Sequence, residues 1–95
     1  MEIKFKAQAG SFESSDVLVM VEPSDKKGRN IELSSTVMIQ YGEGILKEIN
    51  AELDRLNVTD IDIIINDKGA LIPTLHARIE TAVTRARGMQ QGTLA

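Results

Sequence analysis

The chain of 95 residues contains no cysteine and no tryptophan, and its only histidine is His76. Without cysteine, disulfides, thiolate metal sites and cysteine nucleophiles are excluded, so any thiol chemistry has to come from an attached group. The single histidine has no identifiable partners for a catalytic triad. We therefore interpret His76 as a surface or partly buried residue of a helix, and not as a general base.

Aromatic residues are also scarce, with only Phe5, Phe12 and Tyr41, so the core must be built from Ile, Leu, Val and Met. No apolar run reaches membrane-spanning length, and the Met-Glu-Ile-Lys start does not resemble a signal peptide. We expect a soluble cytoplasmic protein. The length predicts one domain over residues 1–88, followed by a flexible C-terminal tail over residues 89–95.

Several kinds of functional site are missing as well. A net charge of −3 argues against nucleic acid as a partner, because neutralising phosphates needs a basic surface. No phosphate-cradling glycine loop is present. Asp60 and Asp62 lie two apart in an expected strand, but no further ligand has a matching spacing, so we predict no metal site. The sequence describes no active site of its own.

Four segments have the composition of β-strands. Residues 1–9 alternate loosely, which is typical of an edge strand, and the continuous apolar run 17–21 favours a central strand. Residues 24–30 are predicted to form a hydrophilic hairpin loop that leads into a short return strand at 31–33. The clearest strand is 58–66, where three isoleucines, at 61, 63 and 65, face one side.

Two helices are expected after these first three strands. Ser34 or Ser35 is a plausible N-cap, and the two glycines at 42 and 44 predict a short first helix or turn, a kink, and then a main helix over about 44–56. Its apolar stripe comprises Leu46, Ile49, Leu53 and Leu56. A tight turn at 66–69 precedes a second helix, with Pro73 in its first turn. The inward face of that helix is formed by Leu75, Ile79, Ala82 and Val83, with Arg78 and Arg85 largely outside it.

The order β-β-β-α-β-α indicates an α+β fold, specifically a two-layer sandwich. We expect a mainly antiparallel sheet with two helices on one face.

The segment from Ala9 to Val17 is the main candidate for a functional site. It lies between two apolar runs and is rich in Gly, Ser and acidic residues, so it is predicted to be an exposed turn. Ser14 on such a turn is poorly placed for catalysis but well placed to accept a covalent group from another enzyme. On the residues alone, the more common interpretation is that Ser14 and Ser15 are ordinary turn residues that bond their own backbone.

Three groups of residues resemble the acyl carrier protein of citrate lyase, its gamma subunit. They are Ala9-Gly10-x-x-Glu13-Ser14-x-Asp16-Val17, then Val37-x-x-Gln40-Tyr41-Gly42, and finally Asp67-Lys68-Gly69-Ala70-Leu71 with Ala77-Arg78-x-Glu80-x-Ala82. The resemblance covers Met1 to about Arg87. Two positions depart from the family pattern: Ser15, where a small residue, often Gly, is expected, and Ile72-Pro73, which replaces an Asp.

The resemblance implies that Ser14 carries the prosthetic group 2'-(5''-phosphoribosyl)-3'-dephospho-CoA, with Ser15 as a possible rival site. The arm would carry acetyl and citryl thioesters while citrate is cleaved to acetate and oxaloacetate. The chain itself would then be a non-catalytic subunit. Its partners would be the alpha (acyl transferase) and beta (citryl lyase) subunits and a prosthetic-group transferase, with no nucleic acid and no membrane.

Further roles follow from the same resemblance. Glu13 and Asp16 would be recognised by the attaching enzyme or would simply keep the turn solvated. The Asp67-Lys68-Gly69 turn and Arg78 could contact phosphates of the arm, a partner subunit, or neither. Two alternatives to the citrate lyase carrier remain: the related carrier of malonate decarboxylase, and an unmodified structural adaptor that holds partner subunits.

Overall fold

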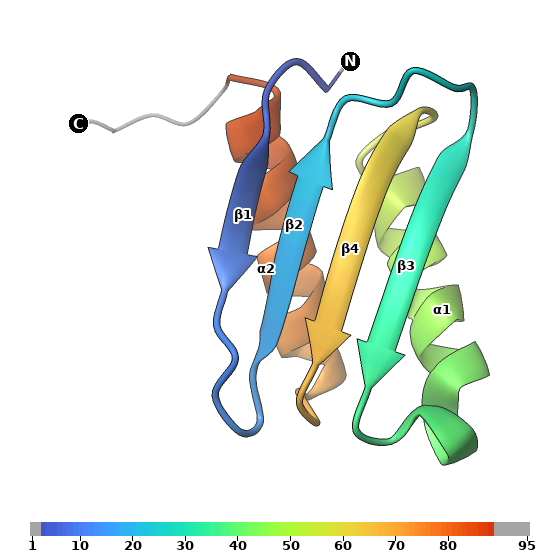
Figure 1. The fold of residues 1–95 in the computed structure, drawn as a ribbon, viewed down its shortest axis with the longest axis vertical. Coiled ribbons are helices and arrows are strands. Elements are labelled where there is room, and N and C mark those ends of the chain that lie inside the picture. The colour runs from blue at the N-terminus through green and yellow to red at the C-terminus, as the bar shows by residue number, and fades with distance from the viewer. Residues whose placement is uncertain (1–2, 89–95) are drawn as a thin grey trace.

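The computed structural model describes residues 3–88, which form a four-stranded sheet covered on one face by two helices (Figure 1). The strands are β1 (Ala7–Gly10), β2 (Val17–Glu22), β3 (Arg29–Ser35) and β4 (Ile61–Asp67), and the helices are α1 (Met38–Arg55) and α2 (Ile72–Ala86). The predicted α+β class, element order and placement of both helices on one face are confirmed. No helix within residues 3–88 combines the length and the apolar character needed to cross a membrane.

The sheet has the strand order β1-β2-β4-β3. β2 pairs antiparallel with β1 and with β4, whereas β3 runs parallel to β4. The prediction of a hairpin over residues 24–30 is therefore wrong, because β4 lies between β2 and β3. The reason is the composition of the strands: β4 buries Ile61, Ile63 and Ile65 and takes a central place, while the more polar β3 is left at the edge.

The first strand is shorter than the sequence predicted. β1 begins at Ala7, because the backbone N–H groups of Lys4 and Phe5 both donate to the carbonyl of Ala86 at 2.9 Å. The segment before β1 thus caps the C-terminal end of α2 instead of extending the sheet. The predicted tail 89–95 lies outside the described residues.

Helix α1 also differs from the prediction, since it runs without a break through both glycines from Met38 to Arg55. Its N-cap is Val37, with no side-chain cap, and Ser34 and Ser35 belong to β3. A Cβ on Gly42 would lie 2.9 Å from the Met38 sulfur, so this glycine makes room for a side chain of the preceding turn. Packing of the helix against the sheet outweighs the low helix propensity of glycine.

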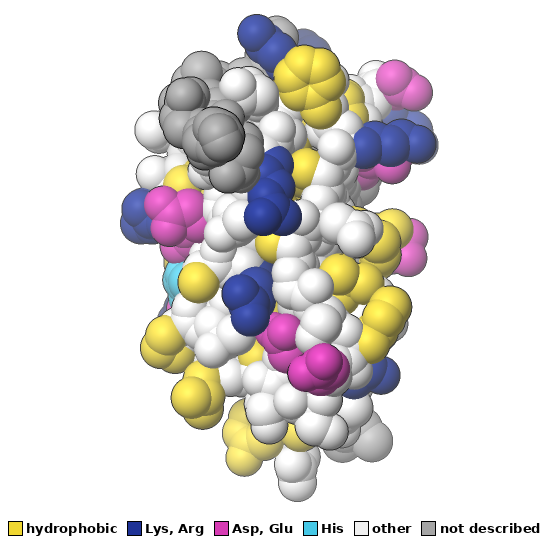
Figure 2. Space-filling model, turned by 90° about the vertical axis from the view of Figure 1, so that its left-hand side faces the viewer, with side chains coloured by type: hydrophobic (Ala, Val, Ile, Leu, Met, Phe, Trp, Pro, Cys, Tyr) yellow, Lys and Arg dark blue, Asp and Glu magenta, His cyan; other side chains and the backbone are white. Residues whose placement is uncertain are grey.

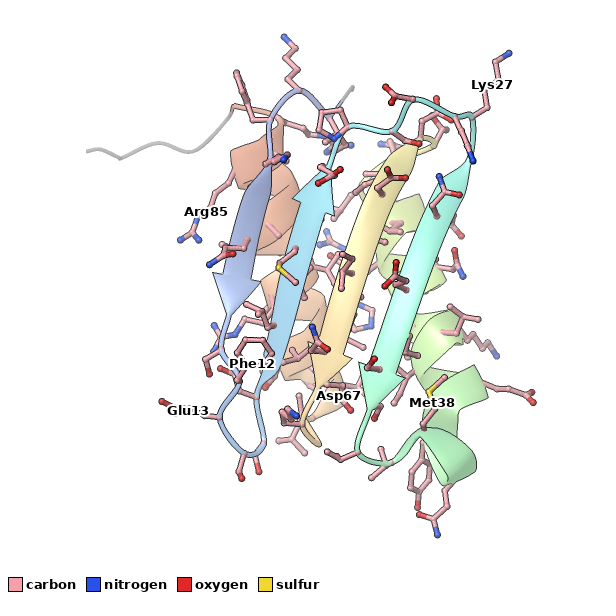
Figure 3. All side chains as sticks on the ribbon, in the orientation of Figure 1. Phe12, Glu13, Lys27, Met38, Asp67 and Arg85 are labelled. Carbon is pink, nitrogen blue, oxygen red and sulfur yellow. The ribbon has the colours of Figure 1, made fainter. Side chains whose placement is uncertain are left out.

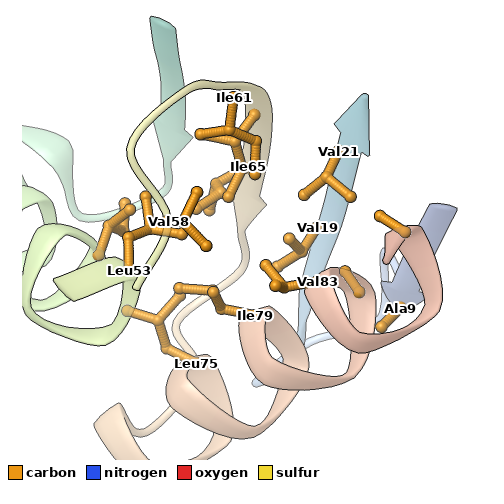
Figure 4. Close-up of a cluster of buried hydrophobic side chains, with 14 of the residues drawn as sticks. Ala9, Val19, Val21, Leu53, Val58, Ile61, Ile65, Leu75, Ile79 and Val83 are labelled. Atoms are coloured by element: carbon orange, nitrogen blue, oxygen red, sulfur yellow. The ribbon is translucent and has the colours of Figure 1, made fainter. Parts of the chain in front are cut away.

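The core lies between the sheet and the two helices (Figure 4). Helix α1 contributes Ile45, Ile49 and Leu53, so the inward position is Ile45 and not the predicted Leu46, which is 40 % exposed. The predicted inward face of α2 is confirmed. The sheet contributes Ala9, Val17, Val19, Val21, Ile61, Ile63 and Ile65. Each fully buried aliphatic side chain of this size contributes about 1.5–3 kcal/mol by leaving water.

A charged cluster joins the two helices. Glu52 of α1 is only 2 % exposed, and its carboxylate is bonded by Arg55 and by Nδ1 of His76 at 2.6 Å. Nε2 of His76 lies 2.8 Å from Glu48. The hydrogen bond with Glu52 raises the pKa of His76, although partial burial opposes this. Burial raises the pKa of Glu52, but the bonds from Arg55 and His76 outweigh it and the net pKa is lowered.

This cluster predicts a pH-dependent stability. Because the folded-state pKa of His76 lies above 6.5, its usual value, the His76 contribution is fully present below pH 6.5 and is lost as pH rises through the folded-state pKa. Thermal unfolding between pH 5.5 and 9 should therefore show Tm falling across that interval in the wild type and much less in His76→Gln. Parallel curves for the two proteins would contradict this assignment.

The glycines of α1 give a second prediction. A Cβ on Gly44 would meet nothing within 4 Å, so Gly44→Ala should raise the free energy of unfolding by about 1 kcal/mol. Gly42→Ala must displace the Met38 side chain and should gain less. Urea unfolding measures both values, and a larger gain at Gly42 than at Gly44 would be inconsistent with the packing described.

Candidate functional site

Ser14 lies at the tip of the loop that connects β1 with β2. Residues 13–16 form a β-turn in which the N–H of Asp16 donates to the carbonyl of Glu13 at 3.1 Å. Figure 3 shows this loop at one end of the sheet, with Glu13 pointing away from the body of the protein. Ser14 and Ser15 are both exposed, and the Ser14 hydroxyl has no hydrogen-bond partner among residues 3–88. The predicted exposed turn is confirmed.

The loop is tied to the turn between β4 and α2. The N–H of Ser15 donates to the carbonyl of Lys68 at 2.8 Å, and the N–H of Lys68 donates to the carbonyl of Asp16 at 2.9 Å. These two bonds join the motif Glu13-Ser14-x-Asp16 to Asp67-Lys68-Gly69, which is more than fifty positions away along the chain. The serine is therefore exposed, but the backbone that carries it is anchored.

Asp16 holds the loop together from within. Its carboxylate accepts hydrogen bonds from the Ser11 hydroxyl at 2.7 Å, the Val17 N–H at 2.7 Å and Arg78 Nε at 3.1 Å. These bonds, with that from Ser11 the strongest influence, lower the pKa of Asp16 to about 2. The sequence suggested recognition or solvation for Asp16, whereas the structure gives it a positioning role. Arg78, expected largely outside the inward face of α2, is half-buried and supplies one of the bonds.

Gly10 is needed at the start of the loop. Its φ is +93°, and a Cβ there would lie 1.8 Å from the carbonyl oxygen of Val17. Such an approach is impossible for any other residue without moving the backbone. The Ala9-Gly10 pair of the family pattern thus has a plain structural cause: it lets the two strands of this hairpin close beneath the serine.

The turn after β4 is built around a buried carboxylate. Asp67 is 5 % exposed and accepts hydrogen bonds from the Ser35 hydroxyl at 2.7 Å and from the Ala70 N–H at 2.9 Å. Gly69 has a φ of +86°, as the sequence predicted for this position. The turn is therefore fixed to β3 as well as to the serine loop. The turn thus holds the serine loop in place and also leads into α2.

Some of the remaining family residues lie beside this turn. Val37 and Tyr41 line a hollow of about 380 Å³ together with Gly69, Ala70 and Ile72. Since both helices begin at the end of the sheet that carries the serine loop, the separated groups of residues converge on one end of the molecule (Figure 1). The sequence showed their order but gave no sign that they meet.

Other candidate residues lie elsewhere. His76 belongs to the cluster between the helices, and no hydrogen bond joins it to the serine loop. Asp60 accepts a bond from the Gly28 N–H and Asp62 one from Asn30. Within the described part of the chain, no three acidic or histidine side chains are grouped as metal ligands.

Comparison with known proteins agrees with this arrangement. A protein-family profile described as the malonate decarboxylase delta subunit (MdcD), of the acyl carrier class, matches residues 4–86. The citrate lyase acyl carrier protein of Clostridium perfringens is 50 % identical over 86 residues, covering 90 % of this chain and 85 % of that protein. Its counterpart in Streptococcus mutans is 48 % identical over 86 residues, with 90 % and 84 % covered.

Solved structures share the fold at much lower identity. A chain in a Pseudomonas malonate decarboxylase hetero-tetramer superposes with a TM-score of 0.71 at 20 % identity, covering 90 % of this chain and 88 % of that one. Part of the homoserine kinase of Cytophaga hutchinsonii also superposes, with a TM-score of 0.57 at 17 % identity and 36 % of that chain covered. The second likeness shows that this fold alone does not define a function.

The matched profile and the identity to the curated carriers define the class: the protein is an acyl carrier protein, of an α+β type. Within that class the chain belongs to the family of citrate lyase acyl carrier proteins, as the resemblance in its sequence implied. It is a carrier subunit and not a catalyst.

Ser15 yields a prediction for the loop. Its φ of +66° is a left-handed conformation that costs a non-glycine residue about 1–2 kcal/mol. Ser15→Gly should therefore raise the free energy of unfolding. The gain should not exceed about 1 kcal/mol, because glycine loses more chain entropy on folding and this offsets part of the relieved strain. Ser15→Val should lower it, since a β-branched residue tolerates this conformation least. Urea unfolding of the two variants tests this, and the opposite order would contradict a left-handed backbone at Ser15.

Proposed function

We propose that the protein is the acyl carrier subunit of citrate lyase and that Ser14 is its attachment site for the prosthetic group. The observation that supports this most directly is the geometry of the loop. The Ser14 hydroxyl is exposed and unbonded within the described chain, while the next two residues are fixed by backbone hydrogen bonds to Lys68. An attaching enzyme would find the hydroxyl free and its position reproducible.

Ser14 is favoured over Ser15 as the acceptor on conformational grounds. Ser15 has the left-handed backbone that glycine adopts most easily, so a residue without any side chain would suit that position best. The position of Ser14 shows no such demand for glycine. Ser14 is therefore the better candidate for the hydroxyl that accepts the prosthetic group.

The residues around the loop fit a phosphate-linked group. Attachment would join the Ser14 oxygen to the phosphorus of an activated phosphoribosyl donor, as the bond from that phosphorus to the donor's phosphate leaving group breaks. The hydroxyl proton would pass to a base of the attaching enzyme. The exposed Lys68 and the Arg78 guanidinium are the cations of the two segments that contact the loop, and they would offset the negative charge of the linking phosphate.

The group, 2'-(5''-phosphoribosyl)-3'-dephospho-CoA, would supply a thiol to a chain that has no cysteine. On that thiol the carrier would hold acetyl and citryl groups while the alpha and beta subunits act on them. Tethering keeps the cargo at a high effective concentration near both active sites. The chain's own contribution is to hold Ser14 outward on a fixed base.

Citrate is favoured over malonate as the source of the cargo because of the sequence identities. The curated citrate lyase carriers are up to 50 % identical over most of the chain, whereas the malonate decarboxylase chain of the same fold is 20 % identical. The family profile is described as a malonate decarboxylase subunit, so a carrier of malonate decarboxylase remains the competing assignment.

The test is the intact mass of the protein after co-expression with the attaching enzymes of a citrate lyase system. We expect the wild type and Ser15→Ala to gain the mass of the prosthetic group and Ser14→Ala to gain none, with all three showing the same circular dichroism spectrum. Loading of Ser14→Ala but not Ser15→Ala would move the site by one residue.

Substrate assignment needs a second step with the loaded protein. Acyl exchange should be observed with citrate and the citrate lyase partner subunits, and not with malonate and the malonate decarboxylase subunits. The reverse result would assign the protein to malonate decarboxylase. If no variant and no wild type gains mass, the protein is an unmodified adaptor and the proposal is wrong.

A further inference from the structure

Exposed apolar side chains are unevenly distributed over the molecule. Of the large hydrophobic residues that are exposed in the described chain, several belong to segments at the end that carries Ser14: Phe12, Met38, Tyr41, Leu71 and Ile72. In Figure 2, hydrophobic side chains lie at the lower left of the molecule and along its right edge, and a further group lies at the top. Apolar groups that gather on a surface mark an interaction site more often than scattered ones do.

Three of these residues belong to the chain segments next to Ser14. Phe12, two residues before Ser14, is 63 % exposed, and Leu71 and Ile72 are 72 % and 41 % exposed. Leu71 follows Lys68 by three residues, which span at most about 10 Å of chain, and Lys68 is bonded to Ser15. We call Phe12, Leu71 and Ile72 the apolar rim. Ile72 also lines the hollow of about 380 Å³ beside Tyr41, so the rim continues into a concave surface that can receive a partner's side chain.

No core requirement explains this exposure. The inward faces of both helices and of the sheet are already filled by aliphatic residues, and the rim side chains project beyond them. A phenylalanine and a leucine that remain more than half exposed contribute little to folding. Side chains exposed to this degree are available for a partner to cover.

Geometry indicates which partner that is. The catalytic subunits act on the thiol at the far end of the arm, so their chemistry does not require them to contact the residues beside Ser14. The enzyme that attaches the arm has no such freedom, since its active site has to reach bonding distance of the Ser14 oxygen. It must therefore cover the residues beside Ser14, which are the apolar rim.

We propose that the apolar rim is the docking surface for the enzyme that attaches the prosthetic group to Ser14. This inference rests on the proposed function. The partner's surface would be apolar opposite Phe12 and Leu71, with room at its centre for the serine turn. Glu13, exposed beside Ser14, adds a negative charge that favours a basic group on the partner at the edge of this contact.

The experiment measures the initial rate of loading by the attaching enzyme against carrier concentration. The double variant Phe12→Ser/Leu71→Ser should raise KM by at least about tenfold and leave kcat nearly unchanged, because it weakens docking without altering the Ser14 turn. The matched control is Phe5→Ser/Leu46→Ser, which removes a phenylalanine and a leucine that are 55 % and 40 % exposed and do not belong to the rim. This control should keep the wild-type KM.

A second readout avoids the loading reaction. Calorimetric titration of the attaching enzyme with Ser14→Ala, which cannot be loaded, should show binding, and adding the two rim substitutions should weaken it at least about tenfold. Equal KM values and equal affinities for rim and control variants would overturn the inference while leaving the proposed function intact. Absence of any loading of the wild type would instead overturn the proposed function, and this inference with it.

Self-association is the competing use of such a surface. If sedimentation shows that the wild type is a dimer and that the rim substitutions make it a monomer, a second copy covers the rim and the inference is wrong. We expect wild type and rim variant to sediment alike as monomers.

Discussion

Two backbone hydrogen bonds between the serine loop and Lys68 are the contacts on which the rest of this site depends. A hairpin loop that projects from the end of a sheet would otherwise be free to sample many conformations. Here Ser15 and Asp16 are hydrogen-bonded to Lys68, the first residue after β4. These bonds fix the loop to the end of the sheet. The neighbouring serine gains a fixed backbone and keeps a free hydroxyl.

The surrounding residues stabilise the two segments that these hydrogen bonds join. Asp16 draws in the Ser11 hydroxyl and the Arg78 guanidinium, and Gly10 allows the close approach of Val17. On the other side, Asp67 is buried and fixes the partner turn through Ser35 and Ala70. Asp16, Asp67 and Arg78 of the family pattern therefore have structural roles. Their contacts determine where the Ser14 hydroxyl is held.

Much of the fold could be predicted from the sequence because its signals are local. The alternation of Ile61, Ile63 and Ile65, the apolar run of β2 and the stripe of α2 each follow from the periodicity of one element. The wrong predictions concern interactions between elements. The sequence did not indicate that β4 inserts between β2 and β3, or that packing would carry α1 through Gly42 and Gly44.

The same distinction applies to the site. Ser14 could be predicted as the candidate site because the turn and the family pattern are both local to it. The role of Arg78 could not, because it bonds Asp16 from 62 positions away. Likewise the periodicity of α1 does not mark Glu52 as buried, and its contact with His76 of α2 explains its burial. Pairings of this kind are set by tertiary packing and leave no periodic trace in the sequence.

The central claim is that this protein carries the thiol of an attached prosthetic group on Ser14 and catalyses no reaction itself. The most direct measurement is tandem mass spectrometry of peptides from the carrier purified within its assembled lyase. The account predicts a fragment series that places the whole added mass on Ser14, with Ser15 and every other hydroxyl unmodified. An unmodified Ser14 in a lyase that cleaves its substrate at full rate would contradict it.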